Sequence, residues 1–120
     1  MKHKPKAAEN CKISFWLTAK QDGKEGRFIM VGNSFLLSER VQELQASARC
    51  VYLAMCMESG GKAYFTFPEK AMKKYGFDPS TAKRAIKTLI ANGFITCTCS
   101  GKNTRTANEY KFCFRWKGIE

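Results

Sequence analysis

The hydrophobic and polar positions along this chain change period several times, and each change predicts a different element. Residues 11–19 and 27–32 are β-rich apolar runs on either side of KQDGKEG, whose Asp-Gly pair and second glycine are typical of a turn. We therefore expect a β-hairpin over residues 11–32. The residues before it, 1–10, are polar and Lys-rich and include a proline, so we expect a disordered basic tail there.

The pattern becomes helical after this hairpin. The stretch NSFLLSERVQEL (33–44) predicts a short lead-in helix, on one side of which lie Leu37, Val41 and Leu44. A stronger helix is expected over SARCVYLAMCMESGG (47–61), with Ser47 as its N-cap and a pair of glycines at its end. Apolar residues cover nearly the whole circumference of this second helix, which predicts that it is the buried centre of the domain.

A short strand and a short helix are expected next. KAYFTF (62–67) is β-rich, and Pro68 suits the start of a helix, where its missing N–H costs nothing. EKAMKKYG (69–76) then makes about two helical turns and ends at a glycine.

Start and stop signals agree best in FDPSTAKRAIKTLIANG. They predict a helix over 79–92, with Asp78 as N-cap, Pro79 in the first position and Gly93 as a left-handed cap. Beyond it, FITCTCS (94–100) and EYKFCFRW (109–116) predict two strands, and the polar segment between them, 101–108, predicts a projecting loop.

The helices at 69–76 and 79–92 are joined by the tight turn YGFDP. Two helices joined in this way form a helix-turn-helix, whose second helix enters the DNA major groove. Five apolar residues form one stripe along that second helix: Ala82, Ala85, Ile86, Leu89 and Ile90. The remaining face is polar and basic and contains no acid, although a merely solvated helix face usually mixes charges of both signs. We therefore expect its counter-charges to be phosphates.

The side chains on this face suit base and phosphate recognition. Arg84 can donate two hydrogen bonds to guanine, short hydroxyl groups suit base edges or phosphates, and lysines neutralise phosphate. The loop 101–108 would reach the flanking backbone or the minor groove as a wing. The candidate DNA-binding residues are Ser80, Thr81, Lys83, Arg84, Lys87, Thr88, Lys102, Asn103 and Arg105.

The composition supports a polyanionic partner. The 120 residues include 21 Lys and Arg against 10 Asp and Glu, a formal charge of +11. Residues 1–34 carry 7 basic and 3 acidic side chains (+4), residues 35–62 carry 3 of each, and residues 63–120 carry 11 against 4 (+7). The basic surface therefore belongs mainly to the C-terminal half, which holds the predicted helix-turn-helix.

Together these segments resemble a winged helix-turn-helix domain over roughly residues 33–116. AIKTLIANGFI is similar to the junction where such domains pass from the recognition helix to the wing. The short strand and lead-in helix before the central helix are also similar to the N-terminal DNA-binding domains of plasmid and phage replication initiators. The resemblance implies an α+β winged helix-turn-helix over 33–117, preceded by the hairpin.

The resemblance also implies a function. It predicts duplex DNA binding by a bacterial transcriptional regulator, or by the DNA-binding part of a replication initiator of a plasmid, phage or other mobile element. The alternative is a winged-helix module that binds other proteins, for which the positive charge is incidental. We expect a monomer or a weak homodimer, with the 11–32 hairpin, whose edge could pair with another chain, or the 33–44 helix as the candidate dimer surface.

Other functions are disfavoured. His3 is the single histidine, so the chain has no Cys–His or Ser–His pair in its body, and its acids are scattered, which argues against an enzyme.

The thiols of Cys97, Cys99 and Cys113 could share one face of a hairpin, but zinc needs a fourth ligand and wider spacing, so we expect no metal and leave a redox role open. Aromatic residues such as Phe112 and Trp116 could stack on single-stranded bases, although alternating aromatics in strands are more typical of core.

The expected compartment is the cytoplasm. The first residues lack the apolar run of a signal peptide, so the six cysteines are interpreted as thiols in a reducing environment. No apolar stretch approaches the ~20 residues that span a bilayer. We therefore expect no membrane partner, and the sequence points to no small-molecule cofactor.

Overall fold

A computed structural model of the chain describes residues 17–23, 26–99 and 108–118 and has a mixed α+β architecture. The expected tail (1–10), the start of the expected hairpin (11–16) and the centre of the loop between the last two strands (100–107) lie outside the described residues. In the described part, no helix is long and apolar enough to cross a membrane.

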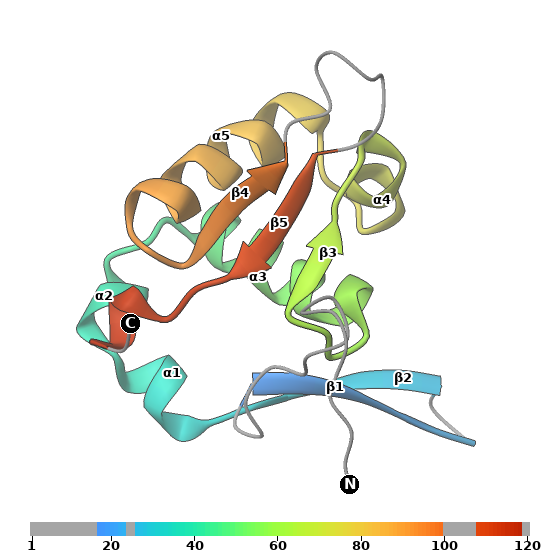
Figure 1. The fold of residues 1–120 in the computed structure, drawn as a ribbon, viewed down its shortest axis with the longest axis horizontal. Helices are drawn as coiled ribbons and strands as arrows, with labels where there is room; N and C mark the ends of the chain where they lie inside the picture. Colours follow the sequence, from blue (N-terminus) through green and yellow to red (C-terminus); the bar gives the residue numbers. More distant parts are fainter. Residues whose placement is uncertain (1–16, 24–25, 100–107, 119–120) are drawn as a thin grey trace, which may run out of the picture.

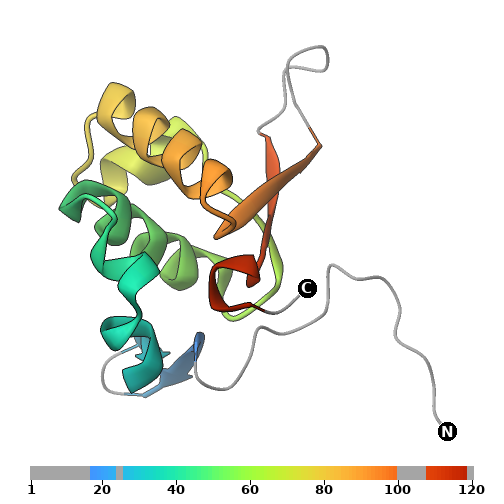
Figure 2. The same ribbon diagram turned by 90° about the vertical axis from the view of Figure 1, so that its left-hand side faces the viewer.

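Helices and strands form two layers (Figures 1 and 2). The main helices are α3 (Ala46–Ser59), α4 (Glu69–Lys74) and α5 (Pro79–Ala91). Against them lies an antiparallel sheet in the order β3-β5-β4, whose strands are β3 (Tyr64–Thr66), β4 (Ile95–Cys99) and β5 (Glu109–Phe112). Helix, strand, helix, turn, helix, strand and strand thus follow one another as the hydrophobic pattern predicts.

The last two strands, β4 and β5, pair antiparallel. Ile95 pairs with Phe112 and Cys97 with Tyr110, and the register shifts between Cys97 and Cys99. β5 ends earlier than the predicted 109–116, because the chain turns into a short 3₁₀ helix, η2 (Arg115–Lys117). The indole of Trp116 in η2 stacks on Phe94 with ring centroids 5.1 Å apart, so this tryptophan belongs to the core and not to a strand.

The expected hairpin is present as β1 (Leu17–Asp22) and β2 (Gly26–Val31), paired antiparallel. Its strands extend further into KQDGKEG than expected. The hairpin packs against α3, where Arg27 Nη1 donates hydrogen bonds to the carbonyl oxygens of Met57 (2.9 Å) and Glu58 (3.4 Å). A guanidinium in this position satisfies carbonyls that the end of a helix leaves unpaired.

The expected lead-in helix over 33–44 is two short helices, α1 (Asn33–Leu37) and α2 (Glu39–Gln42). They are separated by Ser38, whose backbone is extended (φ −68°, ψ 131°). The break changes the helical phase, so Leu37 does not share one side with Val41 and Leu44 as expected: it is 65% exposed, whereas Phe35 is buried. Val41 and Leu44 are buried as expected.

Helix α3 is the buried centre of the molecule, as predicted. It begins after Gln45 and not at the expected cap Ser47, because the backbone N–H groups of Ala48 and Arg49 already bond to the carbonyl of Gln45. Tyr52, with no exposed surface, packs face to face on Phe35 and meets Phe94 and Phe112 edge on. These rings join α1, α3, β5 and the segment between α5 and β4 in one aromatic core.

Two glycines set the direction of the chain after α4 and after α5. After α4, Gly76 (φ 84°) allows the N–H of Phe77 to bond to the carbonyl of Met72. After α5, Gly93 (φ 80°) allows the N–H of Phe94 to bond to the carbonyl of Leu89 in the same arrangement. Both are Schellman caps, and they set the directions in which α4 leads into α5 and α5 leads into β4.

Candidate nucleic-acid interface

One face of α5 is exposed and basic. The helix buries Ala82, Ala85, Ile86 and Leu89 against the core, as the apolar stripe predicts, while Ile90 is half-buried. The exposed candidates follow helical spacing and form what we call the α5 basic face: Ser80, Lys83, Arg84 and Lys87. The candidates Thr81 and Thr88 are half-buried on one flank of this face.

Arg84 and Lys87 carry the charge of this face that no described ion pair holds, although the carboxylate of Asp78 interacts electrostatically with Arg84. Among the residues that the structure describes, the ion pairs found join Lys83 to Glu69 and Lys74 to Glu58, so neither Arg84 nor Lys87 is paired with a carboxylate. Arg84 lies near the middle of the exposed arc, between Ser80 and Lys87 along the helix. Its planar fork is therefore free to form a bidentate contact.

The prediction that the face has no acidic counter-charge holds within α5 but is wrong for the folded protein. Lys83 Nζ lies 2.6 Å from Glu69 Oε2, which belongs to the first turn of α4. The hydrogen bond and the charge of Lys83 hold the pKa of Glu69 below its usual value. More than half of each side chain is exposed, so the pair contributes little to stability and a stronger anion could displace it.

Ser80 is partly committed to capping α5. Asp78 accepts hydrogen bonds from the backbone N–H of Ser80 (3.2 Å) and from the Ser80 hydroxyl. These bonds lower the pKa of Asp78, the hydroxyl bond being the largest cause. With its proton donated to Asp78, the Ser80 hydroxyl can offer lone pairs to a donor on a base but has no proton for a phosphate.

The remaining candidates belong to the expected wing. Lys102, Asn103 and Arg105 lie outside the described residues. The strands that lead into this segment, β4 and β5, are paired with each other, and β4 lies beside α5 (Figure 1). Cys97 of β4 and Asn108 before β5 line the same cavity as Lys83 and Lys87, so the described ends of these strands lie close to the α5 basic face.

Helix α4 adds basic residues that the candidate list omitted. Lys70, Lys73 and Lys74 are exposed on α4, so residues 69–93 carry 6 basic against 2 acidic side chains. Lys74 is paired with Glu58 at 2.8 Å, which leaves Lys70 and Lys73 as further positive charges before the turn. The pattern EKAMKK, with lysines at helical spacing, was the available signal for them.

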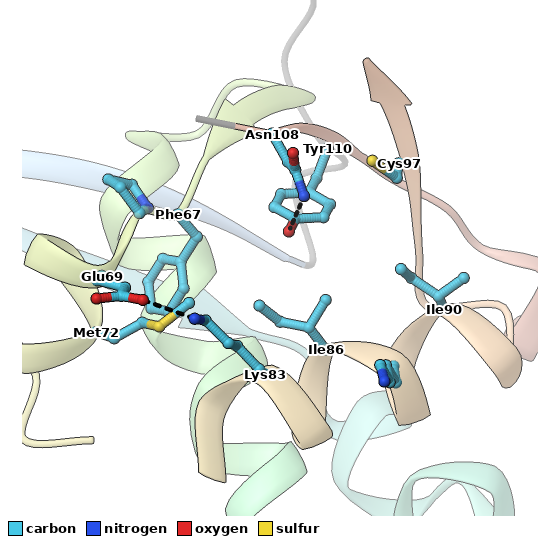
Figure 3. A pocket seen from close by; sticks show the side chains of 11 residues that line it. Phe67, Glu69, Met72, Lys83, Ile86, Ile90, Cys97, Asn108 and Tyr110 are labelled. Carbon is cyan, nitrogen blue, oxygen red and sulfur yellow. Dashed lines mark hydrogen bonds and ion pairs between the residues drawn. The ribbon is translucent and has the colours of Figure 1, made fainter. Parts of the chain in front are cut away.

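A cavity of about 750 Å³ lies between α4, α5 and the β4–β5 strands (Figure 3). Its lining is mostly apolar, with lysines and a carboxylate among the polar groups: Phe67, Pro68, Glu69, Met72, Lys83, Ile86, Lys87, Ile90, Cys97, Asn108 and Tyr110. Sequence reasoning missed this cavity, since its walls come from segments that are distant in the chain and no local pattern marks them.

Two of the cysteines considered for zinc, Cys97 and Cys113, belong to different parts of the β4–β5 strand pair. Cys97 pairs with Tyr110, whereas the backbone N–H of Cys113 bonds to Phe94 at the other end of the strand pair. Within the described ranges, no three His, Cys, Asp or Glu side chains are placed to hold a metal ion.

The chain was also compared with known proteins. No family model, curated protein or solved structure matches it. The function proposed below is therefore inferred from the chemistry of the residues described above.

Proposed function

We propose that this protein binds duplex DNA through the α5 basic face and the β4–β5 hairpin, with the topology of a winged helix-turn-helix. In this proposal it acts as a transcriptional regulator, or as the DNA-binding part of a replication initiator of a mobile element. The observation that carries the proposal is that Arg84 and Lys87, on the second of two helices joined by a tight turn, are exposed and form no ion pair with a described carboxylate.

The size of an α-helix and the charge on the exposed face of α5 agree with DNA binding. A major groove about 12 Å wide admits one α-helix, and α5 is anchored on the core along the side opposite its basic face. In the proposed complex, Arg84 donates two hydrogen bonds to a guanine, while Lys87 and Lys83 neutralise phosphates. Lys83 would exchange Glu69 for a phosphate oxygen at little cost, because that ion pair is exposed.

The test is a salt-dependent binding measurement. Duplexes that the protein binds are first selected from a random library. One selected duplex is then labelled and titrated with the protein at several salt concentrations, and binding is followed by fluorescence anisotropy. We expect log K to fall steeply with log salt, with a slope of about −0.9 for each phosphate contact. Replacing Arg84 and Lys87 together by Ala should weaken binding about tenfold or more and make the slope shallower.

A matched double variant separates local contacts from total charge. Arg40→Ala with Lys62→Ala removes the same two charges from exposed positions on α2 and next to β3. We expect this control to weaken binding far less than the α5 variant. Equal losses in the two variants, or no duplex binding at low salt, would show that the α5 basic face is not a DNA-binding surface.

A second candidate function is protein interaction. Its candidate contact residues are the large apolar side chains that the described structure leaves exposed, Leu36 (58%) and Leu37 (65%), which are neighbours on α1, and Met30 (39%) on β2. Binding that depends on Leu36 and Leu37, and that is insensitive to salt and to Arg84, would favour this alternative.

A further inference from the structure

The cavity beside α5 has the size and lining of a small-molecule site. Its volume of about 750 Å³ lies within the range of roughly 300–1,000 Å³ that ligand pockets occupy. Buried side chains form its inner wall: Phe67, Met72, Ile86 and Tyr110. Half-buried Ile90 points into the same space from the next turn of α5 (Figure 3). Such walls favour a flat apolar or aromatic body.

The charged groups at the cavity favour an anion. Lys83 and Lys87 stand against the single carboxylate of Glu69. Glu69 is bound by Lys83 at 2.6 Å, whereas Lys87 has no carboxylate partner among the described residues. The cavity therefore presents one ammonium group whose charge is not neutralised, next to an apolar wall.

Tyr110 adds a hydrogen-bond donor from the opposite wall. Asn108 Nδ2 donates to the Tyr110 hydroxyl at 3.4 Å, so the phenolic proton remains available to another acceptor. Burial raises the pKa of Tyr110, with smaller opposing and reinforcing effects from Asn108 and Cys97, so the phenol keeps its proton at neutral pH. In Figure 3 the Tyr110 oxygen points across the cavity toward α5.

We propose that this cavity binds a small aromatic carboxylate. The ring lies between Ile86 and Ile90 on one side and Phe67 and Tyr110 on the other, and the carboxylate accepts hydrogen bonds from Lys87 and the Tyr110 hydroxyl. Charge complementarity selects the anion, and the apolar wall selects the ring.

The probes are 2-naphthoate and its neutral counterpart 2-naphthylmethanol. Each is titrated into uniformly ¹⁵N-labelled full-length protein, and amide chemical shifts are followed by NMR. We expect 2-naphthoate to shift amides of 67–72, 86–90 and 108–110, and to bind several-fold more tightly than the alcohol. Equal affinities for the two probes, or shifts confined to the exposed Leu36 and Leu37 surface, would overturn the proposal.

Two variants test separately how the carboxylate and the aromatic ring of the ligand contribute to affinity. Lys87→Gln should lower the affinity for 2-naphthoate about threefold to tenfold and leave the alcohol unaffected. Ile90→Phe fills part of the cavity and should lower the affinity for both probes. Lys73→Gln on α4 and Leu37→Phe on α1 are matched controls, because both residues are exposed and neither lines the cavity. Controls that act as strongly as the cavity variants would contradict the assignment.

One consequence rests on the proposed function. Lys83 and Lys87 belong both to the cavity and to the α5 basic face, so 2-naphthoate should weaken duplex binding. The NMR titration uses no DNA and therefore tests the cavity separately. If 2-naphthoate binds and DNA does not, only the DNA proposal fails, whereas duplex binding without 2-naphthoate binding rejects only the cavity proposal.

Discussion

Gly93 combines a backbone requirement with a close contact. It ends α5 with φ 80°, and a Cβ built on it lies 2.9 Å from Arg115 Cβ and 3.4 Å from the backbone N of Trp116. Gly76 ends α4 with φ 84°, but nothing lies within 4 Å of its built Cβ. The two glycines therefore differ in packing and share their conformation.

Replacing each glycine by Ala should separate these two effects. We expect Gly76→Ala to lower the free energy of unfolding by about 1 kcal/mol, the cost of a left-handed non-glycine residue. Gly93→Ala should lower it by about 2–3 kcal/mol, because Arg115 and η2 must also shift. Urea denaturation measures both values. Equal losses would mean that η2 moves away from Gly93 at no cost.

Residues that act through local bonds could be predicted from the sequence. Asp78, Pro79 and Gly93 were all placed correctly around α5, because capping depends on a few neighbouring backbone groups. The Glu69–Lys83 pair could not be predicted in this way, because it joins two helices whose relative position depends on the packing of the core.

At the scale of elements, α3 and α4 are joined by a polar network around Glu58. Its Oε1 accepts hydrogen bonds from the Tyr75 hydroxyl (2.9 Å) and from Lys74 Nζ (2.8 Å). Desolvation opposes ionisation of Glu58, but the bonds from Lys74 and Tyr75 and the charge of Arg27 outweigh it and lower the pKa. Because Arg27 also binds the end of α3, the network lies where the β1–β2 hairpin, α3 and α4 meet.

The lowered pKa predicts an acid-sensitive contribution to stability. The folded-state pKa of Glu58 lies below its ordinary value of 4.5, so the stabilisation is present above that pH and is lost as the pH falls through the folded-state pKa. We expect Glu58→Gln to cost on the order of 0.5–1 kcal/mol near pH 7 and nothing near pH 2, measured by urea denaturation across pH.

Tyr75→Phe provides the contrasting variant. Desolvation and the neighbouring Glu58 raise the pKa of Tyr75, so the phenol stays neutral throughout the acid range. Loss of the Tyr75 hydroxyl should therefore lower the free energy of unfolding at pH 7. Because Tyr75 does not titrate in the acid range, the variant removes no titrating group there. If the cost of Glu58→Gln were independent of pH, the charge of Glu58 would not contribute to the junction between α3 and α4.

The elements themselves were more predictable than their ends. The helices α3, α4 and α5 and the flanking strands could be predicted from the sequence pattern, in which α5 has one apolar stripe and α3 is apolar nearly all round. The break at Ser38 and the early end of β5 were missed, because both depend on where Phe35 and Trp116 enter the aromatic core. Contacts between rings so far apart in the chain leave no local pattern.

At the scale of the whole molecule, the excess charge is unevenly placed. The formal charge of +11 is the sum over the chain, but the exposed carboxylate of Glu69 lies within the basic region formed by α4 and α5. The sequence predicts the total, whereas the local field at α5 depends on which acids the fold brings beside it. The cavity is likewise a product of the fold, since its walls come from α4, α5 and both strands of the hairpin.

The last prediction tests whether the local field or the total charge governs the proposed DNA binding. Glu69→Gln releases Lys83 from its counter-ion, so we expect duplex affinity at low salt to rise about twofold to threefold and the salt dependence to steepen. Glu39→Gln is the matched control, because it removes the same charge from the first turn of another short helix, α2. Anisotropy titrations of both variants should show a clear rise only for Glu69→Gln. Equal gains would mean that DNA responds to the net charge of the molecule, and that Lys83 does not exchange its carboxylate for a phosphate.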